Sequence, residues 1–153
     1  MQEARTNGRA LLHGMAHRFA VTAGARDLGA WSKVSGLAVK WDVAEYRRGS
    51  SDHVDRFAAI PRFDPIRLSR AADSAGTAAV QAWLNEVQAR GGVPEEGAVD
   101  MLTSAGVPVA TWTLREMFPA GWQLSDFDAT TGRVAMETLT IVHNGFLTAA
   151  QRA

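Results

Sequence analysis

The four histidines are the residues best suited to chemistry in this 153-residue chain, and their spacing limits what they can do. His13 and His17 are four residues apart, so on a helix they would share one face and could form part of a metal site. No third ligand lies nearby, and we interpret both as part of a solvated segment. His143 precedes Asn144-Gly145, a turn signal, without a nucleophile close in sequence. We therefore expect His143 to make a structural hydrogen bond.

Motifs for catalysis or cofactor binding are missing from the sequence. It has no glycine-rich phosphate loop, no His-Glu-x-x-His pair, no Gly-x-Ser-x-Gly turn and no EF-hand loop. It also has no cysteine, which excludes a disulfide framework and a thiolate metal site. We expect no catalytic residue, no metal and no cofactor, and we do not expect an enzyme.

Glu137 is a carboxylate in an apolar strand pattern. It shares strand parity with Leu139 and Ile141, which would place it on a buried face. A buried carboxylate needs a charged or hydrogen-bonding partner. We interpret Glu137 as one half of a structural ion pair or as a residue at a solvent-facing rim, with a role in subunit contact as the alternative.

Two further groups of charged residues are candidates for binding. Residues 49 to 60 form a charged loop that is either a solvated tip or a contact with a neighbouring chain, carried by Ser51, Asp52, His53, Asp55 and Arg56. Five arginines could suggest a nucleic-acid groove: Arg47, Arg48, Arg62, Arg67 and Arg70. No aromatic residues are interleaved with them and acids lie nearby, so a solvated face is the better interpretation.

The composition is that of an ordinary globular domain, with 46% hydrophobic and 21% charged residues. Lys plus Arg equals Asp plus Glu at 16 each, which argues against a nucleic-acid coat protein and permits close packing of identical subunits. No apolar run approaches the roughly 20 residues that cross a bilayer, so we expect no membrane anchoring. The N-terminus has no secretory pattern, and assembly in the cytoplasm is the default expectation.

The clearest strand contains Val39, Trp41 and Val43, which alternate with Lys40, Asp42 and Ala44. This period of two predicts a strand with one buried face and makes Trp41 a core anchor. Gly49 ends the strand. Further strands are expected at residues 18 to 23, 28 to 34, 66 to 70, 99 to 103, 107 to 114 and 133 to 143, with a turn at 94 to 97 and a break at Phe118-Pro119.

One helix is expected after Asp73 or Ser74, either of which can cap it. Val80, Trp83 and Val87 recur at helical spacing, and Gly91-Gly92 ends the helix. Trp83 should anchor this helix on a sheet, and Trp112 is expected to be a third core anchor. The pattern predicts a mainly β fold with one helix, an antiparallel sandwich or barrel over residues 18 to 153, preceded by an arm at residues 1 to 17.

Six short motifs resemble, in order and spacing, the tail tube proteins of contractile phages and of phage-derived contractile injection particles. They cover roughly residues 18 to 147 and are Phe19-Ala-Val21, Trp31-Ser-Lys-Val-Ser-Gly-Leu37, Glu45-Tyr-Arg-Arg-Gly49, Ile66-Arg-Leu-Ser-Arg70, Trp112-Thr-Leu114 with Phe118-Pro119, and Val134-Ala-Met-Glu-Thr-Leu-Thr-Ile-Val-His-Asn-Gly145. No single motif is specific, whereas the ordered set is.

The resemblance implies hexameric rings that stack into a tube around a lumen, inside a sheath and above a baseplate with its spike. Cargo or phage DNA would pass through the lumen. Residues 37 to 46 would contribute to the lumen wall, with Lys40, Asp42 and Ala44 facing the lumen and Val39, Trp41 and Val43 packed on a second sheet. The charged loop would contact neighbouring subunits. Each subunit contact should bury more than about 1,000 Å².

Two other functions remain open at this point. Within the same family, the chain could form a baseplate-proximal initiator or adaptor ring. From a different class, it could be a small β-barrel enzyme or ligand-binding protein with a pocket inside the barrel.

Overall fold

The computed structural model describes residues 18–50, 52–126, 130 and 132–147. The expected arm at residues 1 to 17, with His13 and His17, and the loop residue Ser51 lie outside these ranges. The elements in chain order are β1 Arg18–Ala23, β2 Arg26–Trp31, β3 Lys33–Ser35, β4 Val39–Arg47, β5 Val54–Phe63, β6 Ile66–Ala71, α2 Ser74–Ala89, β7 Glu95–Leu102, β8 Pro108–Leu124 and β9 Met136–Val142.

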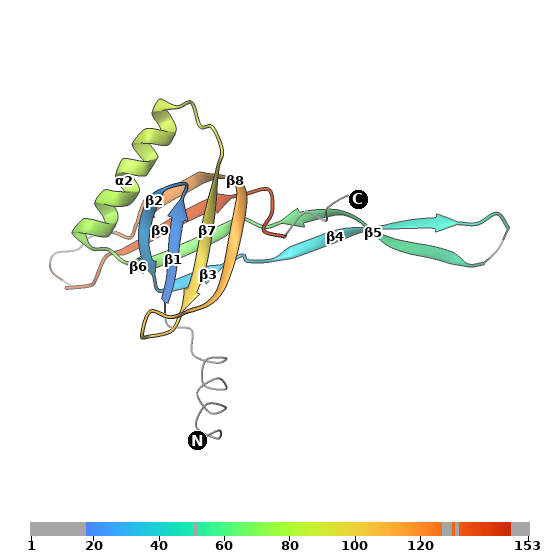
Figure 1. The fold of residues 1–153 in the computed structure, drawn as a ribbon, viewed down its shortest axis with the longest axis horizontal. Coiled ribbons are helices and arrows are strands. Elements are labelled where there is room, and N and C mark those ends of the chain that lie inside the picture. The colour runs from blue at the N-terminus through green and yellow to red at the C-terminus, as the bar shows by residue number, and fades with distance from the viewer. Residues whose placement is uncertain (1–17, 51, 127–129, 131, 148–153) are drawn as a thin grey trace, which may run out of the picture.

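Seven antiparallel strands form one curled sheet in the order β2-β1-β7-β8-β9-β6-β3. Helix α2 lies at its side, and β4 and β5 form a separate two-stranded ribbon that projects away from it (Figure 1). The prediction of a mainly antiparallel β fold with one helix is therefore confirmed. The expected strand at 28 to 34 is divided into β2 and β3 at Ser32, and β7 already begins within the expected turn at 94 to 97.

Strand β8 belongs to both halves of the curled sheet. Its first part, residues 108 to 117, pairs with β7, and its last part, residues 118 to 124, pairs with β9. We call β2, β1, β7 and the first part of β8 sheet A, and the last part of β8 with β9, β6 and β3 sheet B. The expected break at Phe118-Pro119 does not occur, because a register shift between Pro119 and Gly121 accommodates the proline within the strand.

The core lies between the two sheets and under the helix. Alternate residues of each strand point inward, among them the fully buried Val21, Leu28, Leu68 and Leu139. Sequence patterns identified these strands because each has one buried face.

Helix α2 packs on the barrel through Val80, Trp83 and Val87. Asp73 caps it by accepting a hydrogen bond from the Gly76 backbone N–H at 2.6 Å. The helix ends before Gly91, whose φ of +73° suits glycine. Trp83 is 1% exposed, and its Nε1 donates to Glu95 Oε1 at 2.6 Å. This helix therefore matches the expectation from sequence.

The three expected tryptophan anchors differ in their surroundings. Trp83 is buried, and Trp112 is partly buried and packs against the core. Trp41, in contrast, lies on the projecting ribbon and is 46% exposed. The alternation of Val39, Trp41 and Val43 indicated a strand correctly, but no second sheet within the described residues covers it. Residues 54 to 60 of the expected loop are likewise strand, because they pair with β4.

A buried ion pair joins Arg70 of β6 to Glu137 of β9. Arg70 Nε donates to Glu137 Oε2 at 2.9 Å, and the two side chains are 6% and 0% exposed. Glu137 also accepts from Trp122 Nε1 at 2.9 Å and from Thr77 Oγ1 at 3.3 Å. Arg70 thus does not belong to a solvated arginine face: its strand parity places it with Ile66 and Leu68 inside the barrel.

The Arg70 guanidinium also connects the two ends of the curled sheet. Its Nη1 donates to the carbonyl oxygens of Leu28 and Ala30 on β2, at 3.0 and 3.2 Å. Its Cζ lies 3.9 Å from the centre of the Trp31 ring, a cation–π contact. A Cβ at Gly76 would lie 2.9 Å from the same Cζ, so a larger residue there would require the guanidinium to shift. One side chain therefore links β6, β9, β2 and the helix.

Replacing Glu137 by Gln should strongly destabilise the subunit. The Arg70 charge would remain buried without a counter-charge, and removing one partner of such a pair costs about 3 to 5 kcal/mol. Urea unfolding followed by circular dichroism measures the change in unfolding free energy. Glu86→Gln is the matched control, because Glu86 pairs with Arg26 at a site where the side chains are 53% and 31% exposed. That change should cost less than about 1 kcal/mol. Equal losses in both variants would contradict the role given to Arg70 and Glu137.

Candidate subunit interface

The ribbon of β4 and β5 continues the β3–β6 pair of sheet B beyond the barrel. β3 is followed by β4 after three residues, and β5 leads into β6 after Asp64 and Pro65. Strands β4 and β5 pair from Val39↔Phe63 to Arg47↔Val54, with a register shift between Trp41 and Val43. Figure 1 shows that the ribbon extends well past the other strands. From here on, 'the arm' means this ribbon, residues 39 to 63, and not the N-terminal segment of residues 1 to 17.

The register separates the arm into two faces, because directly paired residues share a face. The Lys40 face contains Lys40, Asp42, Ala44 and Tyr46 with Asp55, Phe57 and Arg62 opposite them. The Trp41 face contains Val39, Trp41, Val43 and Glu45 with Arg56, Ala58, Pro61 and Phe63 opposite them. Near the barrel the Trp41 face is apolar, whereas the Lys40 face carries charge on both strands.

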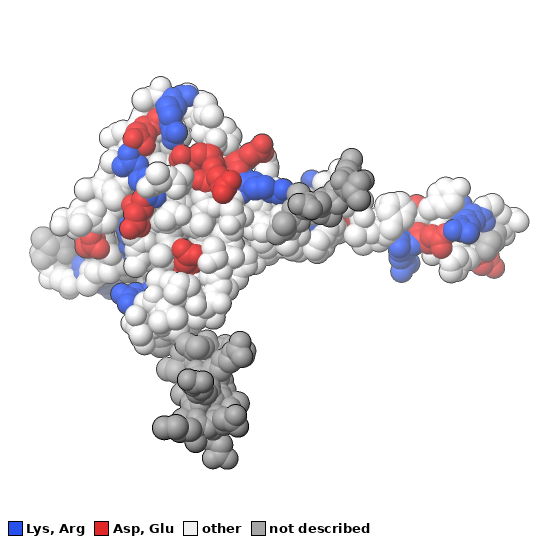
Figure 2. Space-filling model, in the orientation of Figure 1, with Lys and Arg blue, Asp and Glu red and all other residues white. Residues whose placement is uncertain are grey.

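Exposed ion pairs bridge the two strands of the arm. Arg62 Nε lies 2.8 Å from Asp42 Oδ2, and Arg56 Nε lies 3.0 Å from Glu45 Oε1. Nearer the tip, Asp55 contacts Arg48 at 2.9 Å and His53 at 3.0 Å. Exposed pairs of this kind contribute little stability, and they mainly favour one register. Figure 2 shows both signs of charge gathered on the outer part of the arm.

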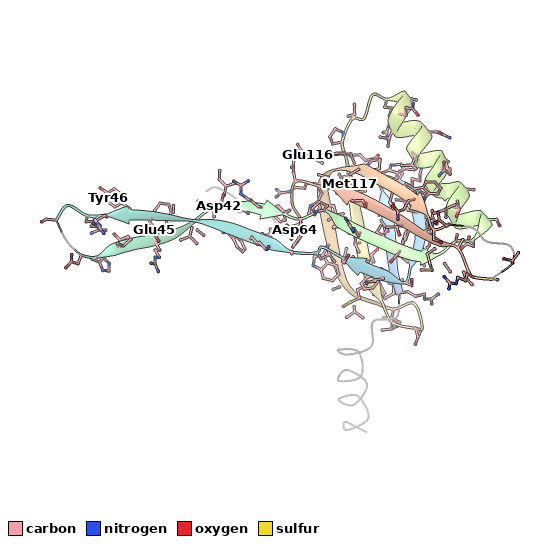
Figure 3. All side chains as sticks on the ribbon, turned by 180° about the vertical axis from the view of Figure 1, so that it is seen from behind. Asp42, Glu45, Tyr46, Asp64, Glu116 and Met117 are labelled. Carbon is pink, nitrogen blue, oxygen red and sulfur yellow. The ribbon has the colours of Figure 1, made fainter. Side chains whose placement is uncertain are left out.

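The residues expected in a subunit-contact loop occupy two kinds of structure. Asp52 and His53 lie in the connection between β4 and β5, at the tip. Asp55 and Arg56 belong to strand β5, paired with Tyr46 and Glu45. The segment is therefore the end of a hairpin, and Figure 3 shows Glu45 and Tyr46 on its outer half, away from the barrel.

Large apolar side chains are exposed along the arm. They are Trp41, Val43, Tyr46, Phe57 and Ile60, with exposed fractions from 46 to 71%. A two-stranded ribbon is at best marginally stable alone in water, and a contiguous exposed apolar surface marks an interaction site. The arm therefore has the composition of a surface that another molecule covers.

Sheet B has two open edges. β3 pairs with β6 only, and residues 118 to 124 of β8 pair with β9 only. In the described part of the chain, no strand pairs with the outer side of either segment. Unpaired backbone N–H and C=O groups at such edges are suited to pairing with another strand.

The directions of these two edges are complementary. β3 is antiparallel to β6, β6 to β9, and β9 to β8, so the two edge strands run in opposite directions. When copies are placed side by side in the same orientation, β3 of one copy therefore meets β8 of the next as an antiparallel pair. The contact is head-to-tail, and such contacts close into rings when the rotation between copies permits it.

The middle of the outer face of sheet B is polar and carries mainly small side chains, whereas Phe118 and Val142 at one end and Met136 at the other share its strand parity. Two rows follow from the strand register: Ser35, Arg67, Thr140 and Gly121, and Lys33, Ser69, Thr138 and Gln123. A shallow hollow of about 220 Å³ lies over part of this face. The residues of this face were not among the expected binding residues, although the alternation in residues 66 to 71 and 136 to 142 contained the signal.

The other sequence candidates are structural. The Gly145 backbone N–H donates to His143 Nδ1 at 3.1 Å, as expected of a histidine beside a turn. Over the residues that the structure describes, no group of three or more His, Cys, Asp or Glu side chains is placed to hold a metal ion. Within those same ranges, no helix is both long and apolar enough to span a bilayer.

Comparisons with known proteins place this geometry in a family. The model of the T4-like virus tail tube protein gp19 family matches residues 15–147. A search of curated proteins finds no match.

Several solved structures have the same fold. The extended sheath–tube complex of the extracellular contractile injection system PVC contains a chain with a TM-score of 0.72 and 23% identity, covering 92% of this chain and 94% of that one. The PVC sheath/tube terminator has a TM-score of 0.68 and 24% identity, with coverages of 88% and 94%. The baseplate of the anti-feeding prophage AFP has 0.65 and 24%, with coverages of 86% and 92%.

Similarity at these identities establishes the fold, and the family match extends over most of the chain. The chain, with its curled antiparallel sheet, two complementary open edges and projecting ribbon, therefore belongs to the T4-like virus tail tube protein gp19 family.

Proposed function

We propose that six copies of this chain close into a ring by pairing β3 of each copy with residues 118 to 124 of its neighbour, and that these rings stack into the inner tube of a contractile phage tail or injection particle. The complementary direction of the two open edges of sheet B supports this proposal most strongly. The number six follows from the family resemblance. Sheath and baseplate proteins would be the outer and terminal partners, with cargo or phage DNA inside.

The outer face of sheet B would form the wall of the lumen. Four strands from each of six copies give about 24 strands, and at about 4.8 Å per strand such a wall is roughly 40 Å across before strand tilt is included. Small and polar side chains suit a wall along which another molecule slides without adhering. The two middle rows of this face contain no large aromatic residue, whereas Phe118, paired with Val142, lies at one end of it.

The arm would pack its Trp41 face against a neighbouring copy. Burial of Trp41, Val43 and Pro61 would stabilise the contact by removing apolar surface from water, at about 25 cal/mol per Å². We therefore keep Lys40, Asp42 and Ala44 as the proposed axis-facing side of the arm, because their charged surroundings tolerate solvent. Asp52, His53, Asp55 and Arg56 at the tip would contact the same or the next neighbour.

Engineered cysteines test the edge pairing, since the natural chain has none. Within one copy, Ser35 and Gln123 lie on strands three spacings apart, so they are separated by at least about 14 Å. A disulfide bridges only roughly 7 Å. Oxidation of the Ser35→Cys/Gln123→Cys variant should give a ladder of disulfide-linked copies that ends at six on a non-reducing gel. If the register between copies differs by two residues, Ser35→Cys/Gly121→Cys should give this ladder instead.

The control for the cysteine experiment is Ser35→Cys/Thr113→Cys, because Thr113 pairs with Ala98 in sheet A. This variant should remain unlinked. A ladder in the control alone, or no ladder with either sheet B partner, would contradict the proposed ring contact.

Trp41→Asp tests the arm. Because Trp41 is 46% exposed in the single copy, the subunit should remain folded, with the circular dichroism spectrum of the natural protein. Assembly should fail, because the change places a charge in a buried contact. Negative-stain microscopy measures the number of rings and tubes. Val93→Asp, at a 58% exposed valine outside the arm, is the control and should assemble normally. Normal tubes from Trp41→Asp would refute the contact between the Trp41 face and a neighbouring copy. An unfolded subunit would refute it as well, because it would place Trp41 in the core.

A further inference from the structure

His143 lies where the arm joins the barrel. It follows the last residue of β9 and is 4% exposed. Its ring centre is 5.5 Å from that of Phe63, the last residue of β5, and 5.9 Å from that of Phe146. The two phenyl rings meet edge to face at 5.2 Å. This three-ring cluster fixes the base of the arm to the end of sheet B.

The hydrogen bonds around His143 require a neutral ring. Nδ1 accepts the Gly145 backbone N–H at 3.1 Å, so Nδ1 carries no proton. Nε2 is buried without a hydrogen-bond partner of good geometry in the described ranges, although the nearby Asp64 backbone favours the protonated ring. The turn that Nδ1 stabilises is also hydrogen-bonded to β8. The Arg115 N–H donates to the Gly145 carbonyl oxygen, and the Asn144 N–H donates to the Arg115 carbonyl oxygen, both at 2.9 Å.

Gly145 shows how tightly the cluster is packed. Its φ is +136°, and a Cβ there would lie 3.1 Å from the Phe63 ring and 2.8 Å from Arg115 Nη2. The ring cluster and the turn therefore have little room to rearrange while both stay in place.

Charged groups surround the cluster without neutralising an imidazolium inside it. Asp64 lies at the β5–β6 junction, and Arg115 and Glu116 belong to β8. Glu95 and Glu96 of β7 lie across a groove of about 490 Å³. Glu116 accepts a hydrogen bond from Asn144 Nδ2, and Glu95 binds Trp83 and Arg90. No ion pair to His143 occurs in the described part of the chain. Figure 3 shows Asp64, Glu116 and Met117 grouped near the base of the arm.

We propose that His143 is a proton-sensitive latch: when its ring takes up a proton, the turn at Gly145 and the contact with Phe63 are released, and the base of the arm becomes mobile. A proton on Nδ1 would point at the Gly145 N–H, so two donors would face each other. The charge would also be buried among phenyl rings without a counter-ion, which is costly. The latch belongs to a single copy, so it holds whether or not copies assemble into rings.

Burial lowers the pKa of His143 below its ordinary value of 6.5 and outweighs backbone hydrogen bonds with Gly145 and Asp64, which raise it. The direction of the pH dependence follows from this lowered pKa. A histidine with a lowered pKa in the closed state stabilises that state fully above pH 6.5. This contribution is lost as the pH falls below 6.5 toward the lower pKa. In that interval the equilibrium constant for opening should rise up to about tenfold per pH unit.

Hydrogen exchange followed by mass spectrometry tests the latch on the full chain, with rates corrected for the pH dependence of chemical exchange. Between pH 7.5 and 5, protection of residues 57 to 66 and 143 to 147 should fall in the natural protein. In His143→Asn it should stay constant, because the Asn oxygen can accept the Gly145 N–H and does not titrate. His53→Asn is the control: it removes the exposed arm histidine and should keep the full pH response.

Identical pH responses in the natural protein and His143→Asn would overturn the proposal. If His143→Asn does not fold, the imidazole resonance of His143 and the amides of residues 57 to 66 are titrated by NMR in the natural chain. A shared midpoint supports the latch, and different midpoints refute it. Both measurements report on one copy, so failure of the latch is distinct from failure of ring assembly.

Discussion

The ion pair between Arg70 and Glu137 is the interaction on which the rest of the subunit depends. Burying two charges is costly, and here the cost is offset because nearly every polar atom of the pair has a partner. Glu137 accepts from Arg70, Trp122 and Thr77, and Arg70 also donates to two carbonyl groups of β2. The pair thereby sets how β2 and β6 approach each other and where the helix begins. All of these contacts lie within one copy.

The subunit combines a buried core with unpaired strand edges and an exposed arm. The core side chains, the helix and the ion pair complete the barrel without help from another chain. In the described part of the chain, the two edges of sheet B pair with no further strand, and the apolar side chains of the arm are exposed. Open edges usually risk uncontrolled aggregation. Here β3 has only three residues and the other edge contains Pro119, so few registers allow a stable pair. A formal net charge of zero adds no long-range repulsion between copies.

Sequence reasoning succeeded for elements that bury one face within the same copy. Helix α2, β6 and β9 were recognised because Trp83, Leu68 and Leu139 recur with the period of their element. It failed for the arm. Val39, Trp41 and Val43 alternate as core residues do, and the same pattern arises on a surface that a second chain would cover. The partner strand was read as a loop, because Pro61 and the charges of residues 52 to 56 are typical of loops.

Arg70 was missed for a different reason. It was grouped with the other arginines by residue type, although its parity with Ile66 and Leu68 placed it inside. The lumen-facing side of Lys40, Asp42 and Ala44 was assigned from the most conspicuous strand and stays a prediction. The polar rows of sheet B did not stand out in the sequence, because they are spread over four strands that only the fold brings together. The period of apolar residues along a strand or helix identifies a buried face, but it does not show whether the same chain or a second chain buries that face.

Electron cryo-microscopy of particles assembled from the full chain tests the central claim most directly. The account predicts a six-fold ring in which the sheet runs without interruption around a hollow axis, each β3 hydrogen-bonded to the last part of β8 in the adjacent copy. Rings in which these two margins face solvent, or particles that stay single at every protein concentration, would contradict it.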